Sequence, residues 1–112
     1  MAYGTDVKNN TVNKVLDYFI TEIRNKLGSH VKRVVLFGSR ARGDQMEQSD
    51  YDCLIVVDEA SSEITNSVDE VAGEALYKYG AVFSAFIVTE RKLAQGMRNP
   101  FLVNVEREGI DL

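Results

Sequence analysis

The stretch FGSRARGDQMEQSDYDCLIVVD, residues 37–58, decides the fold, because two extended segments meet in it. The first segment, Val31–Phe37, is β-branched and apolar and ends at a Gly-Ser turn, so we expect a strand. The second, Tyr51–Val57, predicts another strand that is mostly buried. Residues 39–49 between them are polar and leave room for only a short helical turn.

Apolar residues at helical spacing predict helices on both sides of these strands. From Val12 to Leu27 they follow one side of a helix, for which Asn10 or Thr11 is the expected N-cap and Gly28 the stop. Further helical segments are expected at Ser61 or Ser62 to Tyr79 before Gly80, from the cap Thr89 through Gln95, and from Pro100 through Glu108 before Gly109.

A third strand is expected at Ala81–Val88, which is apolar except for Ser84. Such a run is typical of a strand that is covered on both faces or lies in the middle of a sheet. The order helix, strand, strand, helix, strand, helix, helix predicts an α/β (α+β) fold in which helices pack on one small mixed sheet. At 112 residues we expect one domain, residues 1–112.

Composition limits the classes of function. Hydrophobic residues make up 45% and charged residues 27%, which excludes a disordered chain. Thirteen Lys and Arg against 17 Asp and Glu give a net charge of −4, which argues against strong nucleic-acid binding but leaves room for one bound nucleotide. The single cysteine, the lack of long apolar runs and the polar N-terminus predict a cytoplasmic protein that does not enter a membrane.

Two carboxylates open the second strand. Side chains alternate along a strand, so Asp50 and Asp52 point the same way, about 7 Å apart. Such a pair can hold a hard divalent cation, and Mg²⁺ needs only a few carboxylates, water and substrate phosphates. Asp50 and Asp52 are therefore the candidate metal ligands and catalytic residues, for Mg²⁺ or Mn²⁺.

Phosphate-binding groups precede this pair. A turn at Gly38 and Ser39 lets backbone amides and a hydroxyl approach phosphate oxygens, and Arg40 and Arg42 can neutralise their charge. A metal on a phosphate held by backbone donors is the minimum for nucleotidyl transfer. The joint pattern therefore predicts a site for a nucleoside triphosphate.

These residues resemble a known family. Gly38-Ser39, ten intervening residues and Asp50-Tyr51-Asp52 are similar to the signature of the polymerase beta type nucleotidyltransferase superfamily, and in particular to its minimal nucleotidyltransferases. The resemblance covers nearly the whole chain, including the ending NPFLVNVEREGIDL. It implies that Gly38 and Ser39 hold the triphosphate and that the two aspartates bind the metal. It also implies a helical HEPN protein as partner in a toxin-antitoxin module.

One position departs from the family pattern. Family members with a complete site carry a third aspartate on the strand after the second long helix, but residues 81–89 contain no acidic residue. Ser84 is our candidate for that position. A serine is a weak base and a poor ligand for a second Mg²⁺, so nucleotide binding should survive better than catalysis.

Three functions stay open from the sequence. The first is an enzyme that transfers a nucleotidyl group to a hydroxyl on a partner or small molecule. The second is a catalytically degenerate antitoxin or regulatory subunit that acts by complex formation, and the third is a structural subunit whose aspartates are only solvated. A homo-oligomer is also open. We expect His30 and Cys53 to be structural, and stacking on a nucleobase stays open for Tyr51.

Overall fold

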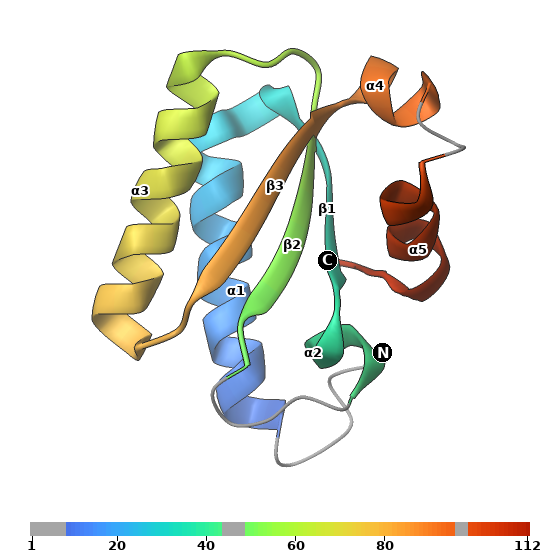
Figure 1. The fold of residues 1–112 in the computed structure, drawn as a ribbon. Coiled ribbons are helices and arrows are strands. Elements are labelled where there is room, and N and C mark those ends of the chain that lie inside the picture. The colour runs from blue at the N-terminus through green and yellow to red at the C-terminus, as the bar shows by residue number, and fades with distance from the viewer. Residues whose placement is uncertain (1–8, 44–48, 96–98) are drawn as a thin grey trace.

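Four strands form one mixed sheet in the computed structural model, which describes residues 9–43, 49–95 and 99–112. Across the sheet the order is β3 (Phe83–Thr89), β2 (Tyr51–Val57), β1 (Val31–Phe37) and β4 (Ile110–Asp111). β1 runs antiparallel to both β2 and β4, whereas β2 and β3 are parallel (Figure 1). The predicted mixed sheet packed with helices is thereby confirmed.

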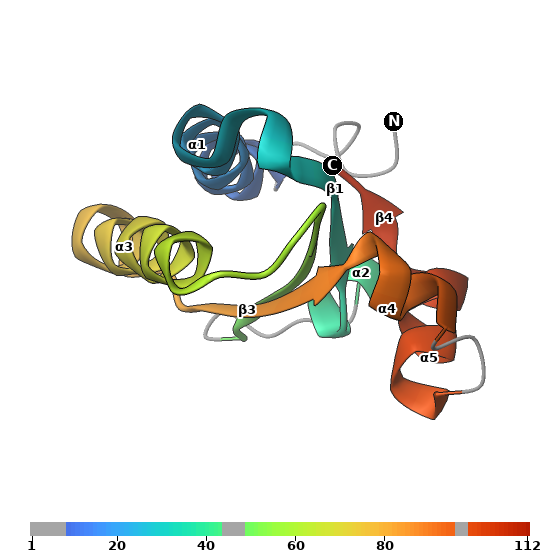
Figure 2. The ribbon, with the colours of Figure 1, turned by 90° about the horizontal axis from the view of Figure 1, so that it is seen from above.

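Helices cover both faces of the sheet (Figure 2). α1 (Asn9–Leu27) and α3 (Ser62–Tyr79) lie side by side on one face, and α4 (Glu90–Gln95) and α5 (Pro100–Glu108) lie against the other. A 3₁₀ turn at Gly28–His30 leads into β1, and α2 (Ser39–Arg42) follows β1. No helix in the described ranges is long and apolar enough to cross a membrane.

Side chains of β2 alternate between two hydrophobic clusters. Cys53 and Ile55 pack in the cluster beneath α1 and α3. Leu54 and Val56 pack in the second cluster, on the α5 side. Burial on both faces explains why Tyr51–Val57 is an almost continuous apolar run. By the same alternation, Asp52 lies on the α5 face of the sheet, opposite to Cys53.

The third strand lies at the edge of the sheet, so its predicted alternative position in the middle is wrong. Its apolar character comes from the clusters on its two faces: Phe83 is buried beneath α1 and α3, and Val88 packs on the α5 side. Coverage of the second face is incomplete, because Phe86 is 44% exposed. The apolar run of residues 81–88 therefore indicated that the strand is packed on both faces, but it did not indicate the position of the strand in the sheet.

The predicted long helices are confirmed, with one cap misplaced. α1 begins at Asn9, so Asn10 and Thr11 lie inside the helix and not at its cap. Ser61 caps α3, since its hydroxyl oxygen accepts a hydrogen bond of 3.2 Å from the N–H of Ile64. Helix ends are difficult to place from periodicity alone.

The C-terminal region contains the two predicted short helices and one strand that was not predicted. The hydroxyl of Thr89 accepts a hydrogen bond from the N–H of Lys92, as expected for the cap of α4. β4 pairs with β1 through only two residue pairs, Val35 with Asp111 and Leu36 with Ile110. Two residues are too few to show a strand periodicity, which is why the sequence did not reveal β4.

Gly109 joins α5 to β4 where no side chain fits. A Cβ there would overlap the carbonyl oxygen of Val105 and a methyl group of Val35. We predict that Gly109→Ala lowers the free energy of unfolding by about 1–3 kcal/mol, the usual cost of overpacking. Gly73→Ala is the control, because Gly73 is an exposed residue inside α3 with open space around its Cβ position. That change should raise the free energy of unfolding by about 0.5–1 kcal/mol.

Urea denaturation measures both variants under identical conditions. Changes of the same sign in the two proteins would contradict the packing assigned to Gly109.

Candidate active site

The carboxylate of Asp52 lies directly against the turn at Gly38. A Cβ on Gly38 would be 3.3 Å from Asp52 Cγ and would overlap Asp52 Oδ2. Gly38 also has φ +78°, a conformation that residues with a side chain rarely adopt. Glycine is therefore required twice at this position, and its small size brings the predicted phosphate-binding turn into contact with a predicted metal ligand.

Strand register brings Phe37, Asp52 and Ser84 into one row. Asp52 is the pairing partner of Phe37 on β1 and of Ser84 on β3. Asp50 precedes β2, and the Ser84 hydroxyl donates a hydrogen bond of 3.3 Å to Asp50 Oδ2. Both carboxylates and the serine thus lie on the α5 face, at the end of β2 where the chain enters the strand.

Burial and a neighbouring charge both make the Asp52 carboxylate harder to ionise. Partial burial raises the pKa of Asp52, the negative charge of Asp50 raises it further, and Arg42 opposes both effects. The two like charges therefore repel one another. A positive ligand between them would relieve that repulsion, so the donor set is suited to a hard divalent cation.

Arg42 links this site to the end of α5. Its Nη1 lies 3.1 Å from Glu108 Oε1, and the same guanidinium is close enough to Asp52 to favour the ionised carboxylate. Glu108 was not among the predicted site residues. Its signal in the sequence was the Glu-Gly pair of the C-terminal ending, which carried part of the family resemblance.

Arg40 contacts the chain just before the carboxylates. Its Nε and Nη2 donate hydrogen bonds of 3.0 and 2.8 Å to the carbonyl oxygen of Ser49. Its guanidinium carbon also lies 3.9 Å from the centre of the Tyr51 ring. The sequence did not single out Ser49, because a backbone carbonyl carries no residue-specific signal.

The structure therefore brings all the predicted site residues to one end of the sheet. Gly38, Ser39, Arg40 and Arg42 lie in the turn and in α2, Asp50 and Asp52 lie at the start of β2, and Ser84 lies beside them on β3. Within residues 9–43, 49–95 and 99–112, no three His, Cys, Asp or Glu side chains are grouped to hold a metal. The roles of these residues stay predictions.

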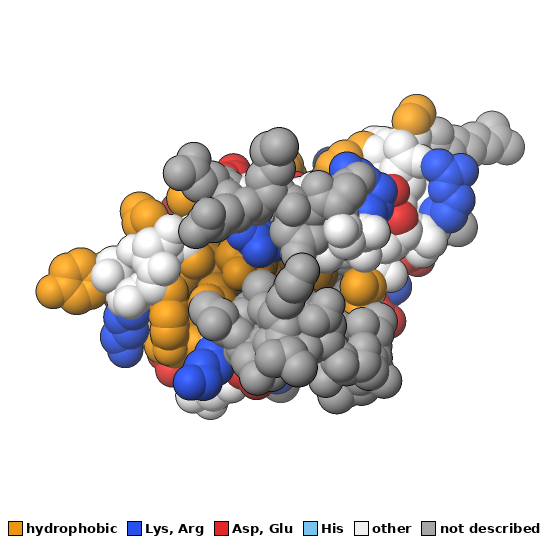
Figure 3. Space-filling view, turned by 90° about the horizontal axis from the view of Figure 1, so that it is seen from below, with side chains coloured by type: hydrophobic (Ala, Val, Ile, Leu, Met, Phe, Trp, Pro, Cys, Tyr) orange, Lys and Arg blue, Asp and Glu red, His pale blue; other side chains and the backbone are white. Residues whose placement is uncertain are grey.

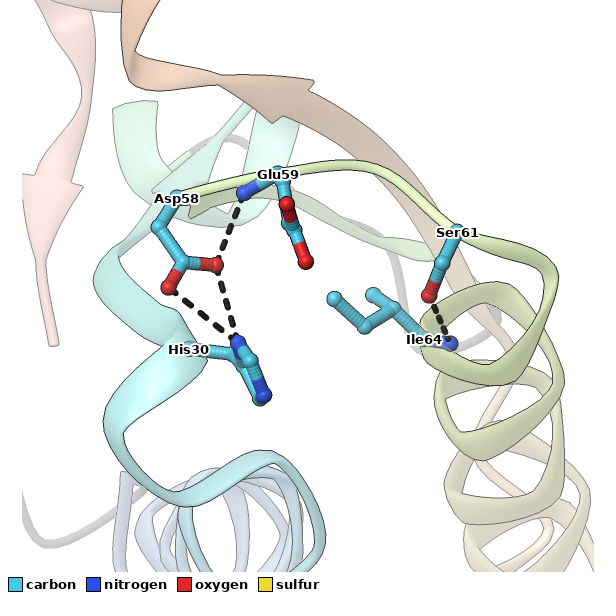
Figure 4. A network of polar contacts seen from close by, with 5 residues as sticks. All are labelled: His30, Asp58, Glu59, Ser61 and Ile64. Atoms are coloured by element: carbon cyan, nitrogen blue, oxygen red, sulfur yellow. Dashed lines mark hydrogen bonds and ion pairs between the residues drawn. The ribbon is translucent and has the colours of Figure 1, made fainter.

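His30 lies at the opposite end of β2. Its Nδ1 is 3.0 Å from Oδ1 of Asp58, and that oxygen also accepts a hydrogen bond from the N–H of Glu59 (Figure 4). The hydrogen bond with His30 lowers the pKa of Asp58. A pocket of about 340 Å³ opens beside this pair, between the end of α1 and the start of α3. The structural role of His30 stays a prediction.

Hydrophobic side chains are exposed at the end of the molecule that carries the candidate site. Viewed from this end, they lie among Lys and Arg side chains (Figure 3). A group that we call the α3–β3 patch lies where α3 ends and β3 begins: Leu76, Tyr77, Tyr79 and Val82. The Tyr77 side chain is 90% exposed. An exposed apolar patch of this kind is typical of a surface that contacts a partner.

The sequence matches a known domain family over most of its length. The model of the nucleotidyltransferase domain family covers residues 16–102, which include the turn, both carboxylates and Ser84. The chain belongs to this family. It is 34% identical over 96 residues to a protein of Methanocaldococcus jannaschii named "Putative protein adenylyltransferase MJ0604", and the match spans 86% of this chain and 92% of that protein. The resemblance to nucleotidyltransferases is thereby confirmed.

Solved structures share the fold of this nucleotidyltransferase-family chain. A mutant of the toxin-antitoxin MntA-HpeT aligns with a TM-score of 0.59 and 15% identity, over 85% of this chain and 69% of that one. A toxin-antitoxin with AMP-PNP aligns with a TM-score of 0.57 and 18% identity, over 94% and 72% of the two chains. At these identities the likeness establishes the fold.

We predict that Gly38→Ala destabilises the protein through two separable effects. One is backbone strain, about 1–3 kcal/mol for a residue with a side chain at φ +78° and ψ −158°, a conformation adopted almost only by glycine. The other is overlap with Asp52, which should disappear when Asp52 is truncated to alanine. In a double-mutant cycle, Gly38→Ala should therefore cost about 1 kcal/mol less in an Asp52→Ala background than in the wild type.

Gly80→Ala is the matched control, since Gly80 has φ +64° and open space around its Cβ position. Its cost by urea denaturation should be the same in both backgrounds. Equal costs of Gly38→Ala in the two backgrounds would show that Asp52 does not lie against the turn.

Proposed function

We propose that this nucleotidyltransferase-family protein binds a nucleoside triphosphate with Mg²⁺, or Mn²⁺, and transfers its nucleotidyl group to a hydroxyl. The observation that carries the proposal is the contact between the Asp52 carboxylate and the Gly38 turn. Phosphate held at the turn would lie beside the carboxylates, which is the arrangement that phosphoryl chemistry needs. The domain would act as one unit over residues 1–112.

Each residue of the site has a role in this proposal. The backbone at Gly38 and the hydroxyl of Ser39 hold phosphate oxygens, while Arg40 and Arg42 place positive charge beside them. Asp50 and Asp52 are the metal ligands and orient the triphosphate. The bound Mg²⁺ would supply charge neutralisation on the reacting phosphate.

The reaction is a substitution at the α-phosphorus. The acceptor oxygen forms a bond to that phosphorus, the bond to the β-phosphate oxygen breaks, and pyrophosphate leaves. The hydroxyl proton must pass to a base, and the Asp50 and Asp52 carboxylates are the candidates that we propose. A Ser84 hydroxyl that donates to Asp50 cannot serve as that base at neutral pH.

A protein hydroxyl and ATP are the acceptor and donor that the relatives favour. The matched protein of Methanocaldococcus jannaschii is named for adenylyl transfer to protein, and one structure with this fold was solved with AMP-PNP. A hydroxyl on a small molecule is the alternative acceptor.

We also propose that a partner protein completes the cleft. Two structures with this fold are toxin-antitoxin proteins, and the exposed α3–β3 patch lies at the same end of the molecule as α2. A HEPN-like helical protein fits the family resemblance.

A degenerate regulatory subunit is the second candidate function. The specific observation that favours it is Ser84, an uncharged residue paired with Asp52 where a third carboxylate would complete a two-metal site. Such a protein would bind nucleotide, or a partner, without rapid transfer.

We predict that ATP binding with Mg²⁺ requires the paired carboxylates. The double variant Asp50→Asn, Asp52→Asn should bind ATP at least about tenfold more weakly in the presence of Mg²⁺, because both metal ligands lose their charge. Without Mg²⁺ it should bind ATP no more weakly than the wild type, since two charges that repel phosphate are gone. Calorimetric titration measures both affinities.

The matched control is Asp69→Asn, which removes a charge from an exposed position of α3. Wild-type affinity in the double variant with Mg²⁺ present would sink the metal assignment.

We predict that Ser84→Asp raises the number of Mn²⁺ ions bound from one to two and lowers stability in metal-free buffer. A third carboxylate adds a ligand, but without metal it repels Asp50 and Asp52. Electron paramagnetic resonance counts bound Mn²⁺, and thermal unfolding with and without Mn²⁺ reports stability. Ser29→Asp, in the turn before β1, adds the same charge far from the site and serves as control.

Transfer assays with labelled ATP then separate the two candidate functions. Rapid, Asp52-dependent labelling of protein by the wild type would exclude the degenerate reading, whereas labelling only by Ser84→Asp would support it.

A further inference from the structure

Arg40 makes a planar two-pronged contact with the backbone. Both hydrogen bonds from Nε and Nη2 end on one atom, the carbonyl oxygen of Ser49. Arginine is suited to this contact because its donors lie in one rigid plane, a geometry that lysine lacks. The next residue along the chain is Asp50, a proposed metal ligand. Arg40 thus holds the peptide group through which the chain enters Asp50.

The face of the same guanidinium lies on an aromatic ring. Its central carbon is 3.9 Å from the centre of the Tyr51 ring, within the range of a cation–π contact. Tyr51 is 5% exposed and stacks on Phe83, with ring centres 4.7 Å apart and planes 15° apart. Phe83 in turn stacks on Phe19 of α1 at 4.0 Å and 3°. Arg40 therefore rests on a stack anchored in the core.

Asp50 is held from both sides by these contacts. On one side Arg40 holds the carbonyl of Ser49. On the other, the N–H of Tyr51 donates to the carbonyl of Val82 at 2.8 Å, while the Tyr51 ring supports Arg40. Asp50 itself is exposed, and its side chain accepts a long hydrogen bond of 3.3 Å from the Ser84 hydroxyl. The direction of its carboxylate therefore depends on its two neighbours in the chain.

We propose that Arg40 is a positioning residue: its guanidinium fixes the Ser49–Asp50–Tyr51 backbone so that Asp50 faces Asp52 and can share a divalent cation with it. This inference rests on the proposed function, because it assumes that the carboxylate pair binds metal. In this proposal Arg40 acts mainly by holding the protein backbone. The competing role is direct contact between Arg40 and a phosphate.

The change in Mn²⁺ affinity on removal of Arg40, measured without nucleotide, has opposite directions for the positioning role and for the phosphate-contact role. If Arg40 contacts phosphate only, its removal takes a positive charge away from the carboxylates, so Mn²⁺ should bind equally well or more tightly. If Arg40 positions Asp50, its removal should weaken Mn²⁺ binding, even though a repelling charge is gone. Loss of residues that orient metal ligands commonly weakens metal affinity by about 10–100-fold.

The experiment measures Mn²⁺ affinity by electron paramagnetic resonance in the full chain, with no nucleotide present. The proteins are wild type, Arg40→Ala, Arg40→Lys, and Arg91→Ala as a control that removes an exposed arginine from α4. Asp50→Asn defines the affinity without one ligand. Hydrogen exchange at the amide of Tyr51, relative to that of Ile55, reports in each metal-free protein whether the entry to β2 has loosened.

We expect both Arg40 variants to bind Mn²⁺ about tenfold more weakly than the wild type and to exchange the Tyr51 amide faster, while Arg91→Ala does neither. Arg40→Lys should not rescue, because the positive charge alone does not restore the fork or the ring contact. Unchanged or tighter Mn²⁺ binding by Arg40→Ala would overturn the inference and favour direct phosphate contact. Wild-type protein that binds no Mn²⁺ would instead overturn the proposed function.

Discussion

The close contact between the Asp52 carboxylate and Gly38 is the constraint on which the site depends. It arises because β1 and β2 are antiparallel neighbours, so that Phe37, the last residue of β1, pairs with Asp52. The chain must then turn immediately beside the carboxylate, and only glycine leaves room for it. A slip of one residue in this register would exchange Asp52 for Cys53 and move a charge into the cluster beneath α1 and α3. The register that buries the hydrophobic side chains is therefore also the register that places the Asp52 carboxylate beside Gly38.

The core supports the site through aromatic rings as well as through the sheet. Phe19, Phe83 and Tyr51 form a stack that runs from α1 through β3 to the first residue of β2. Aromatic pairs of this kind add about 0.5–1.5 kcal/mol each beyond their buried area. Because the stack ends on Arg40, a polar contact at the surface rests on a rigid base. The exposed carboxylate of Asp50 can therefore have a defined direction without being buried.

The sequence was sufficient where a short-range physical rule determines the structure. Alternation along Tyr51–Val57 placed Asp52 and Cys53 on opposite faces, and helical spacing located α1 and α3. The position of β3 at the edge could not be predicted in this way, because side-chain patterns report burial and not the order of strands. β4 was not predicted, because two paired residues are too few to show a strand periodicity.

Some features of the candidate site could likewise be predicted from the sequence, and others could not. Chain proximity and strand alternation were enough to bring the Gly38 turn and the carboxylates together. The partners of Arg40 and Arg42 could not be predicted from the sequence. A long charged side chain can turn toward several neighbours, and only the tertiary structure decides among them. Arg42 forms an ion pair with Glu108, which lies far from it in the sequence, and Arg40 donates to the backbone carbonyl of Ser49.

Ser84 shows how stability and chemistry compete at this site. Partial burial raises the pKa of Asp52 and the negative charge of Asp50 raises it further, so charge repulsion contributes at this site. The Ser84 hydroxyl answers it with a hydrogen bond to Asp50, whereas a carboxylate there would add a third negative charge. Serine thus supports the position of Asp50 without adding a charge. Under the proposed function, a serine here would supply neither a ligand for a second metal nor a base for the acceptor hydroxyl, so the side chain that donates to Asp50 would also limit the rate of transfer.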